Sequence, residues 1–239
     1  MDRMTRHELK QDKLRTAFEH YEAFIKEHFK KIVAAIAIVL AVLGSAAAFK
    51  LYNDRQQSAA NAQLAVALKT FRAYVGGASP EALGPDSQTF SNPQEKYKKA
   101  LGQFVEVAGK YPHQKAGEIA LYHAGVCQSA LGEHVAATKT LQQASSASDR
   151  DVAALAKMAL AGELVNQNKL PDAITVYQQL ADHPTTTVPK ATALLALADA
   201  ERTTRPAQAR EIYQRLQKEM GSNKTLASLL KDQIASLPK

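Results

Sequence analysis

The sequence predicts an all-α chain in which a single N-terminal transmembrane helix precedes an α-solenoid of repeated helix pairs. Three observations lead to this fold class. Residues 32–49 form one uncharged, apolar segment between two lysines. Alanine is abundant, tryptophan is absent and aromatic residues make up only 6% of the chain, which favours packed helices over strands. Four columns of residues in the C-terminal half also recur at intervals of 36 positions.

Residues 1–31 are predicted to form an amphipathic helix on the cytoplasmic side of a membrane. Such a helix can lie at the membrane interface or dock against the helix of a partner protein, and the sequence leaves both roles open. Its large apolar residues recur at steps of three and four, the period of one helix face: Leu14, Phe18, Tyr21, Ile25 and Phe29.

Residues 32–49 are predicted to be a membrane anchor. As a helix this segment spans about 27 Å at ~1.5 Å per residue, close to the ~30 Å hydrocarbon core of a bilayer. Lys31 and Lys50 are placed to reach the two interfaces. A soluble core helix of this length would have a polar face, and none is present. A cleavable signal peptide is the other alternative, because Ala46 and Ala48 fit a small-x-small cleavage site. The preceding segment is, however, unusually long and mixed in charge for a signal peptide, so the anchor is favoured.

Basic residues near the two ends of the anchor indicate its orientation. Five lie in the twenty residues before it and three in the twenty after it. The positive-inside rule therefore places the N-terminus in the cytoplasm and exports the C-terminal part. Small residues in the anchor permit close packing on another transmembrane helix, unless they only face lipid. These are Ala34, Ala35, Ala41, Gly44 and Ala48.

The chain beyond the anchor is predicted to contain four further segments. Between Leu9 and Val75 there is no proline and only one glycine, so the first exported helix is expected to continue the anchor almost without a break. A stretch rich in glycine and proline then interrupts the helical pattern. The segments are a first exported helix at 50–75, a loop at 76–93, helical repeats at 94–220 and a C-terminal capping helix at 221–239.

The columns at intervals of 36 residues define the repeats. In each repeat a small residue lets two antiparallel helices approach closely. The larger residues four and seven positions later fill the gap to the next pair. The columns are Ala124, Leu160 and Ala196; Ala137, Ala173 and Ala209; Leu141, Tyr177 and Tyr213; and Ala144, Leu180 and Leu216. Pro171 and Pro206 lie where second helices begin, a position that tolerates a missing N–H. The predicted pairs are 58–75 with 94–109, 115–130 with 133–146, 150–167 with 171–182, and 188–203 with 206–220.

This helix–turn–helix unit resembles the tetratricopeptide repeat, whose nominal length is ~34 residues. The usual tryptophan position holds Leu121, Lys157 and Ala193, so these would be divergent repeats. Together with the N-terminal stretch TRHELKQDK and an anchor near residue 32, the layout resembles the bacterial family of tetratricopeptide-like proteins related to YfgM, the ancillary subunit of the SecYEG translocon. The resemblance implies a single-pass inner-membrane protein with a periplasmic repeat domain. It also implies partners among translocon subunits, periplasmic chaperones or exported clients.

The repeat register predicts a concave, partner-binding face made by the first helix of each pair. Each of its residues has the alternative of simply packing against a neighbouring helix. Repeats that capture a terminal carboxylate carry lysine and asparagine along this face, whereas Tyr122, Met158 and Leu194 stand here, so apolar or amphipathic segments are the expected ligands. The predicted face is Ile119, Tyr122, Val126 and Ser129; Leu155, Met158, Gly162 and Val165; and Leu194, Ala198 and Glu201.

No catalytic, metal or cofactor site is predicted. The seven histidines show no metal-ligand spacing with one another or with Cys127, and no nucleophile or phosphate-binding motif is present. Cys127 lies in an alanine-rich stretch and is expected to be a small buried core residue. The net charge of +7 includes no dense basic block, which does not favour nucleic-acid binding. The sequence therefore favours a protein-binding scaffold. An envelope-assembly or cell-wall-organising scaffold that handles no unfolded clients stays open as the alternative.

Overall fold

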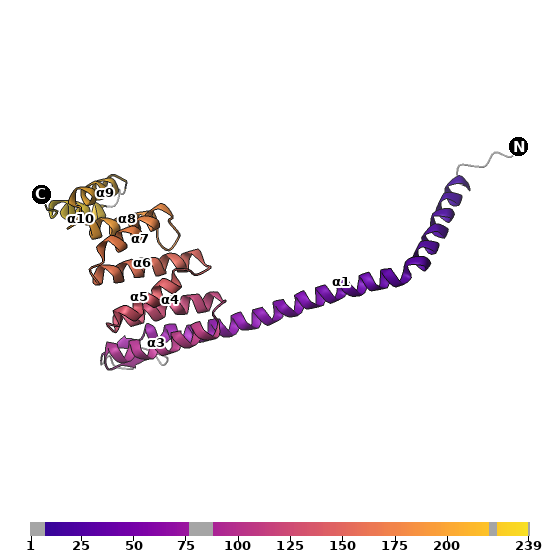
Figure 1. Cartoon of the computed structure of the whole chain (residues 1–239), viewed down its shortest axis with the longest axis horizontal. Helices are drawn as coiled ribbons and strands as arrows, with labels where there is room; N and C mark the ends of the chain where they lie inside the picture. The colour runs from indigo at the N-terminus through magenta and orange to yellow at the C-terminus, as the bar shows by residue number, and fades with distance from the viewer. Residues whose placement is uncertain (1–7, 77–87, 220–223, 239) are drawn as a thin grey trace. The chain divides into compact units, whose positions relative to one another are not determined.

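The computed structural model describes residues 8–76, 88–219 and 224–238, and it describes side chains from His28 onward except at positions 32 and 224 (Figure 1). These residues are mostly helical: they form nine α-helices and one two-stranded parallel sheet. The chain divides into two compact units, Met1–Arg55 and Gln56–Lys239. The predicted all-α class is confirmed apart from the short sheet.

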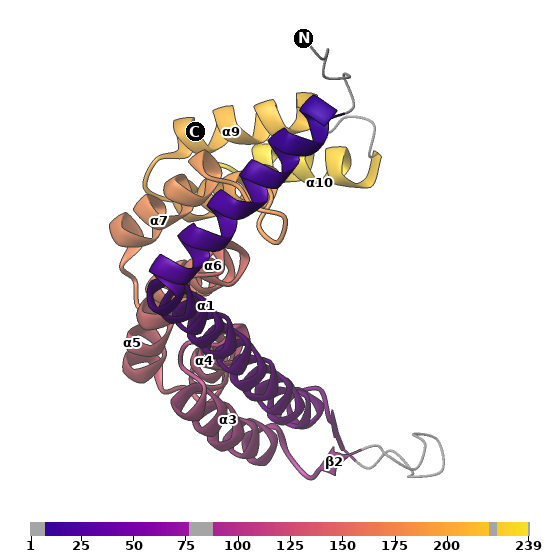
Figure 2. The same ribbon diagram turned by 90° about the vertical axis from the view of Figure 1, so that its right-hand side faces the viewer.

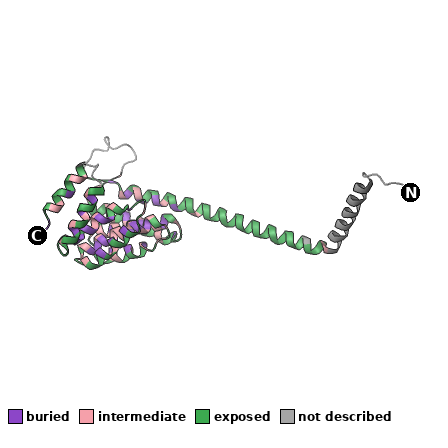
Figure 3. Cartoon of the chain, turned by 90° about the horizontal axis from the view of Figure 1, so that it is seen from above, coloured by how far each residue is buried: buried purple, intermediate pink, exposed green. Residues whose placement is uncertain are grey.

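Helix α1 runs without interruption from Glu8 to Phe71. The prediction that the cytoplasmic helix, the anchor and the first exported helix are continuous is therefore confirmed at the level of secondary structure. In the first unit, the segment from Val33 to Tyr52 is exposed along its whole length, including large apolar side chains such as Leu40 at 63% (Figure 3). It makes α1 the one described helix that is long and apolar enough to cross a membrane. The hydroxyl of Ser45 donates to the carbonyl of Ala41 at 2.8 Å, so this polar group is satisfied within the helix.

The residues predicted to pack the anchor on another helix are all exposed in the first unit: Ala34, Ala35, Ala41, Gly44 and Ala48. A Cβ atom added to Gly44 would meet no atom within 4 Å. Four of the five apolar residues that define the predicted amphipathic face, from Leu14 to Ile25, lie outside the described side chains, although their backbone belongs to α1.

The end of α1 corrects the predicted boundary. The helix ends at Phe71 rather than Val75, and strand β1 (Tyr74–Val75) then pairs in parallel with strand β2 (Thr89–Phe90). Beyond the helix end, the amide of Tyr74 donates to the carbonyl of Gln88, and the hydroxyl of the fully buried Thr70 lies 3.2 Å from Oε1 of Gln88, so these contacts hold the two ends of the connection together. The predicted loop at 76–93 therefore contains a strand, and residues 77–87 of it lie outside the described residues.

The second unit continues with eight helices that pack against one another in chain order (Figures 1 and 2). They are α3 (Pro93–Lys110), α4 (Lys115–Ala130), α5 (His134–Ala144), α6 (Arg150–Asn166), α7 (Leu170–Asp182), α8 (Lys190–Glu201), α9 (Pro206–Glu219) and α10 (Lys224–Ala235). For α3 to α9 the predicted bounds agree to within about two residues, the usual uncertainty of helix ends, whereas α10 is shorter than the predicted segment 221–239. The expected C-terminal helix is present and packs on α9.

Local signals in the sequence set the helix ends. The side chain of Asn92 accepts the amide of Glu95 at 2.9 Å ahead of Pro93, and Asp149 caps α6 by accepting the amides of Asp151 and Val152. The turns after α4 and α6 each require a left-handed residue. Gly132 (φ 78°) and Asn168 (φ 59°) supply it, 36 positions apart. The periodicity of the sequence therefore extends to the turn conformation.

The recurring columns form the core of the second unit. Ala137, Ala173 and Ala209 are completely buried, and the bulky columns that follow them are buried as well. Two apolar clusters result. One is centred on Phe104 of α3 and includes Leu64 of α1, and the other runs from Leu141 to the C-terminal helix. The interpretation of the columns as helix-packing positions is thus confirmed.

Candidate interaction surface

The predicted binding residues of α4 and α6 lie on adjoining helices and are partly accessible. The two helices contact each other, and their predicted residues follow one another at steps of three and four along one side of each helix. All eight are half-buried: Ile119, Tyr122, Val126 and Ser129 on α4, and Leu155, Met158, Gly162 and Val165 on α6. Ile119 packs against the first cluster and Tyr122 against the second, so each has one side in the core. These eight residues, which we call the α4/α6 face, thus pack against neighbouring helices in part, and their binding of a partner stays a prediction.

The third helix does not extend this face. Leu194, Ala198 and Glu201 of α8 are buried, so they do not line an accessible surface. The physical reason is that α8 packs between α7 and α9, where Leu194 and Ala198 belong to the second apolar cluster. The guanidinium of Arg202 donates to Ser236, just beyond the C-terminal helix. For these three residues the packing alternative holds, and the accessible surface is shorter than the repeat register suggests.

A buried carboxylate fixes α4, α5 and α6 at one edge of the α4/α6 face. The side chain of Glu163 is almost completely buried. It accepts the hydroxyl of Ser129 at 2.6 Å, and its second oxygen lies 2.6 Å from Nδ1 of His134. Burial alone would raise the pKa of Glu163, but the hydrogen bonds from Ser129, His134 and Gln167 outweigh it and hold this pKa below its usual value. The carboxylate thus stays charged and holds the three helices in register.

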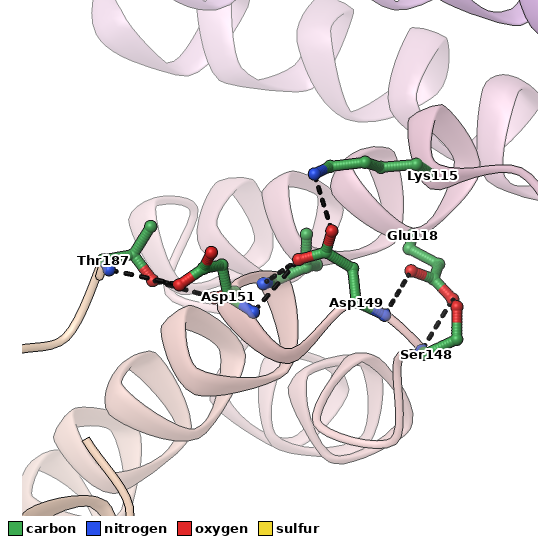
Figure 4. Close-up of polar contacts among 7 residues, drawn as sticks. Lys115, Glu118, Ser148, Asp149, Asp151 and Thr187 are labelled. Carbon is green, nitrogen blue, oxygen red and sulfur yellow. Dashed lines mark hydrogen bonds and ion pairs between the residues drawn. The ribbon is translucent and has the colours of Figure 1, made fainter. Parts of the chain in front are cut away.

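A second polar network connects successive helix pairs at the opposite end of α4 and α6 (Figure 4). The carboxylate of Glu118 accepts the amide and hydroxyl of Ser148, both at 2.7 Å, just before α6 begins. One pair further, Asp151 accepts the amide of Thr187 at 3.2 Å ahead of α8. Lys115 contacts Asp149 at 2.6 Å. Because these bonds join each pair to the next, they restrain the stacking of the pairs as well as the capping of α6.

These networks account for the acidic residues that flank Arg150. The hydrogen bond from Lys115 lowers the pKa of Asp149, and the backbone amide of Thr187 lowers the pKa of Asp151. Asp149 therefore caps α6 and contacts α4 through Lys115, and Asp151 joins α6 to the segment ahead of α8.

An aromatic cluster joins α1, α3 and α4. The ring of His123 stacks on Phe104 at a centroid distance of 5.0 Å and meets Phe71 edge-on at 5.1 Å. Burial, helped by the nearby charge of Arg72, lowers the pKa of His123 to about 4. The imidazole is thus neutral at neutral pH and behaves as one more ring of the core. Sequence reasoning did not single out His123, because its role depends on rings from three helices that are distant in sequence.

Among the described residues, neither the thiol of Cys127 nor the possible metal ligands form a reactive site. Cys127 is buried as expected, and burial raises the pKa of its thiol to about 12, which makes it a poor nucleophile. No group of three or more histidine, cysteine, aspartate or glutamate side chains in the described part of the chain is placed to hold a metal ion. This region presents an apolar surface on helices that polar networks hold together.

Comparison of the chain with known protein families, with curated proteins and with solved structures finds no match.

Proposed function

We propose that the chain is a single-pass inner-membrane protein whose periplasmic domain is a divergent, tetratricopeptide-like α-solenoid that binds other proteins. The observation that carries this proposal is the combination of two apolar surfaces. One is the exposed stretch of α1 from Val33 to Tyr52, and the other is the half-buried α4/α6 face. A soluble monomer rarely leaves an apolar surface as large as the first one uncovered.

Three features of the second unit support the solenoid. The core columns keep a spacing of 36 residues, the left-handed turn residues Gly132 and Asn168 keep the same spacing, and each helix packs on the next in chain order. In repeat proteins each unit contacts mainly its neighbours, which leaves long faces accessible for partners. The terminal helix α10 closes the last pair and buries Leu230, the role of a capping helix.

The proposed orientation rests on the basic residues around the anchor, and the proposed partners rest on the apolar character of the α4/α6 face. The excess of basic residues before the anchor supports a cytoplasmic N-terminus. The α4/α6 face is apolar, with Tyr122 and Met158 at positions where a carboxylate clamp would need cations, and this supports apolar or amphipathic polypeptide segments as ligands. Together with the resemblance to the YfgM-related family, this supports a role accessory to the Sec translocon and periplasmic chaperones.

Photo-crosslinking in intact membranes tests the partner assignment. A photoreactive residue in place of Tyr122 or Met158 of the full-length chain should capture proteins that are identified as translocon subunits, periplasmic chaperones or exported clients. The same residue in place of the exposed Gln178 of α7 is the matched control and should not capture them. Recovery of outer-membrane or wall-building proteins from the α4/α6 face would contradict this role and favour the envelope-organising alternative.

A further inference from the structure

Two hollows on the second unit are related by the repeat of 36 residues. The first has a volume of about 480 Å³ and is bounded by α3, α4 and α5. The second, of about 460 Å³, is bounded by the end of α5, by α6 and by the end of α7. Equivalent residues line them: Gly109 and Ser145, Leu121 and Lys157, and Ala147 and His183. Ala147 lines both hollows, so they lie next to each other, and we call the two together the paired hollow.

The paired hollow is distinct from the α4/α6 face. It uses Gly117, Leu121 and Ala124 of α4, whereas the α4/α6 face uses Ile119, Tyr122 and Val126. At about 100° per residue these two sets point to different sides of the helix. A ligand in the paired hollow therefore does not need the surface on which the proposed function rests.

The first hollow is apolar. Val105, Ala108 and Leu121 form much of its wall, and Val105 is exposed at 53%. The one acidic side chain that lines it is Glu118, whose carboxylate is occupied by Ser148 (Figure 4). This hollow therefore offers apolar contact and no free charge.

The second hollow is basic. Arg150, Lys157 and His183 line it together with the polar side chains of Ser145, Gln179 and Thr185, and no acidic residue is among its lining residues. The carboxylates nearest in sequence to Arg150 are bonded elsewhere, Asp149 to Lys115 and the start of α6, and Asp151 to Thr187. Lys157 is half-buried at a position that holds Leu121 in the preceding pair. A cation in such a setting gains from a partner that brings an opposite charge.

We propose that the paired hollow binds a polypeptide segment of a partner that places apolar side chains in the first hollow and carboxylate side chains in the second. Volumes of several hundred Å³ are those of ligand-binding clefts, and the change from apolar to basic walls fixes which part of the segment lies where. The inference shares with the proposed function only that the partner is a protein.

Peptide binding to the full-length chain in nanodiscs of zwitterionic lipid tests this inference. The probes are two fluorescent 12-residue peptides with blocked ends, each with a leucine- and alanine-rich half and a half containing three glutamates, in the two possible orders. Anisotropy should show saturable binding of at least one of them. Lys157→Glu should weaken that binding about tenfold, because it places like charges together. Lys169→Glu, the same charge reversal at an exposed lysine outside the hollow, should leave it unchanged.

A second pair of variants examines the apolar half. At Gly109, which lines the first hollow, an added Cβ meets no atom within 4 Å, so Gly109→Leu adds bulk to the hollow and should also weaken binding. Gly102→Leu on the same helix has equally open surroundings, lies outside the lining residues and should bind as the unaltered chain does. A peptide with lysines in place of glutamates should prefer the Lys157→Glu variant.

The inference is overturned if neither peptide binds, or if Lys157→Glu and Lys169→Glu reduce binding equally. Its failure is separable from failure of the proposed function, because crosslinking from Tyr122 and Met158 reports on a different surface. If those positions give crosslinks and neither peptide binds, the proposed function stands and only the assignment of the paired hollow as a binding site fails.

Discussion

Gly117→Ala is expected to destabilise the second unit by about 3 kcal/mol, the upper range for overpacking a tightly packed site. A Cβ atom at this position would overlap the carbonyl oxygen of Tyr111 and lie 2.7 Å from its carbonyl carbon. Both obstacles are backbone, and Tyr111 is itself buried, so the turn between α3 and α4 has to move. Urea unfolding of the detergent-solubilised chain measures the effect through tyrosine emission, because the chain has eight tyrosines and no tryptophan.

Gly102→Ala is the matched control for this prediction. It lies within α3, and an added Cβ would meet no atom within 4 Å. Alanine is the better helix former, so this variant should gain up to about 1 kcal/mol. Equal stability of Gly117→Ala and the unaltered chain would show that the Tyr111 carbonyl does not approach α4 as described.

The combined change Ser129→Ala and His134→Ala is expected to cost about 3 kcal/mol, because it leaves the carboxylate of Glu163 buried without these two partners. Glu163 is only 2% exposed, and Ser129 and His134 each contact one of its oxygens. Adding Glu163→Leu to the pair should restore most of the loss, since an apolar side chain needs no hydrogen bond. The same urea unfolding experiment compares the double and triple variants.

The stability of the unaltered chain and the stability of the double variant should change in opposite directions on acidification. In the unaltered chain the pKa of Glu163 is lowered by its hydrogen bonds, so the unfolded chain takes up the proton first and stability falls as the pH drops below about 4.5. In the double variant the buried carboxylate keeps only Gln167 of the three partners Ser129, His134 and Gln167, so burial should raise its pKa. Acidification then protonates it in the folded state and recovers part of the lost stability. A double variant whose stability falls with acid as the unaltered chain does would contradict the role assigned to Ser129 and His134.

The sequence was sufficient for the features that repeat. Ala137, Ala173 and Ala209 keep one spacing because each faces a partner helix at the same point of its pair, and their burial follows from that alone. The apolar run in α1 could also be predicted from the sequence, since only composition and length decide whether a helix can cross a membrane.

Features that do not repeat were beyond sequence reasoning. The end of α1 at Phe71 is followed by the pairing of β1 with β2 across a long connection, where Thr70 also contacts Gln88. The burial of Leu194 and Ala198 depends on how α8 packs between α7 and α9. The paired hollow did leave one signal in the sequence, because Lys157 replaces an apolar residue in the column of Leu121, and a half-buried lysine in an apolar column indicates a local need for charge.

Membrane extraction tests directly whether the chain is anchored in a membrane. Membranes from cells that express the chain are washed at alkaline pH, which removes peripheral proteins, and the chain is then weighed by mass spectrometry. We expect the intact chain of 25.9 kDa to stay in the membrane pellet, held by the exposed apolar stretch of α1. Release of the intact chain into the wash, or recovery of a shorter chain cleaved after the apolar segment, would contradict it.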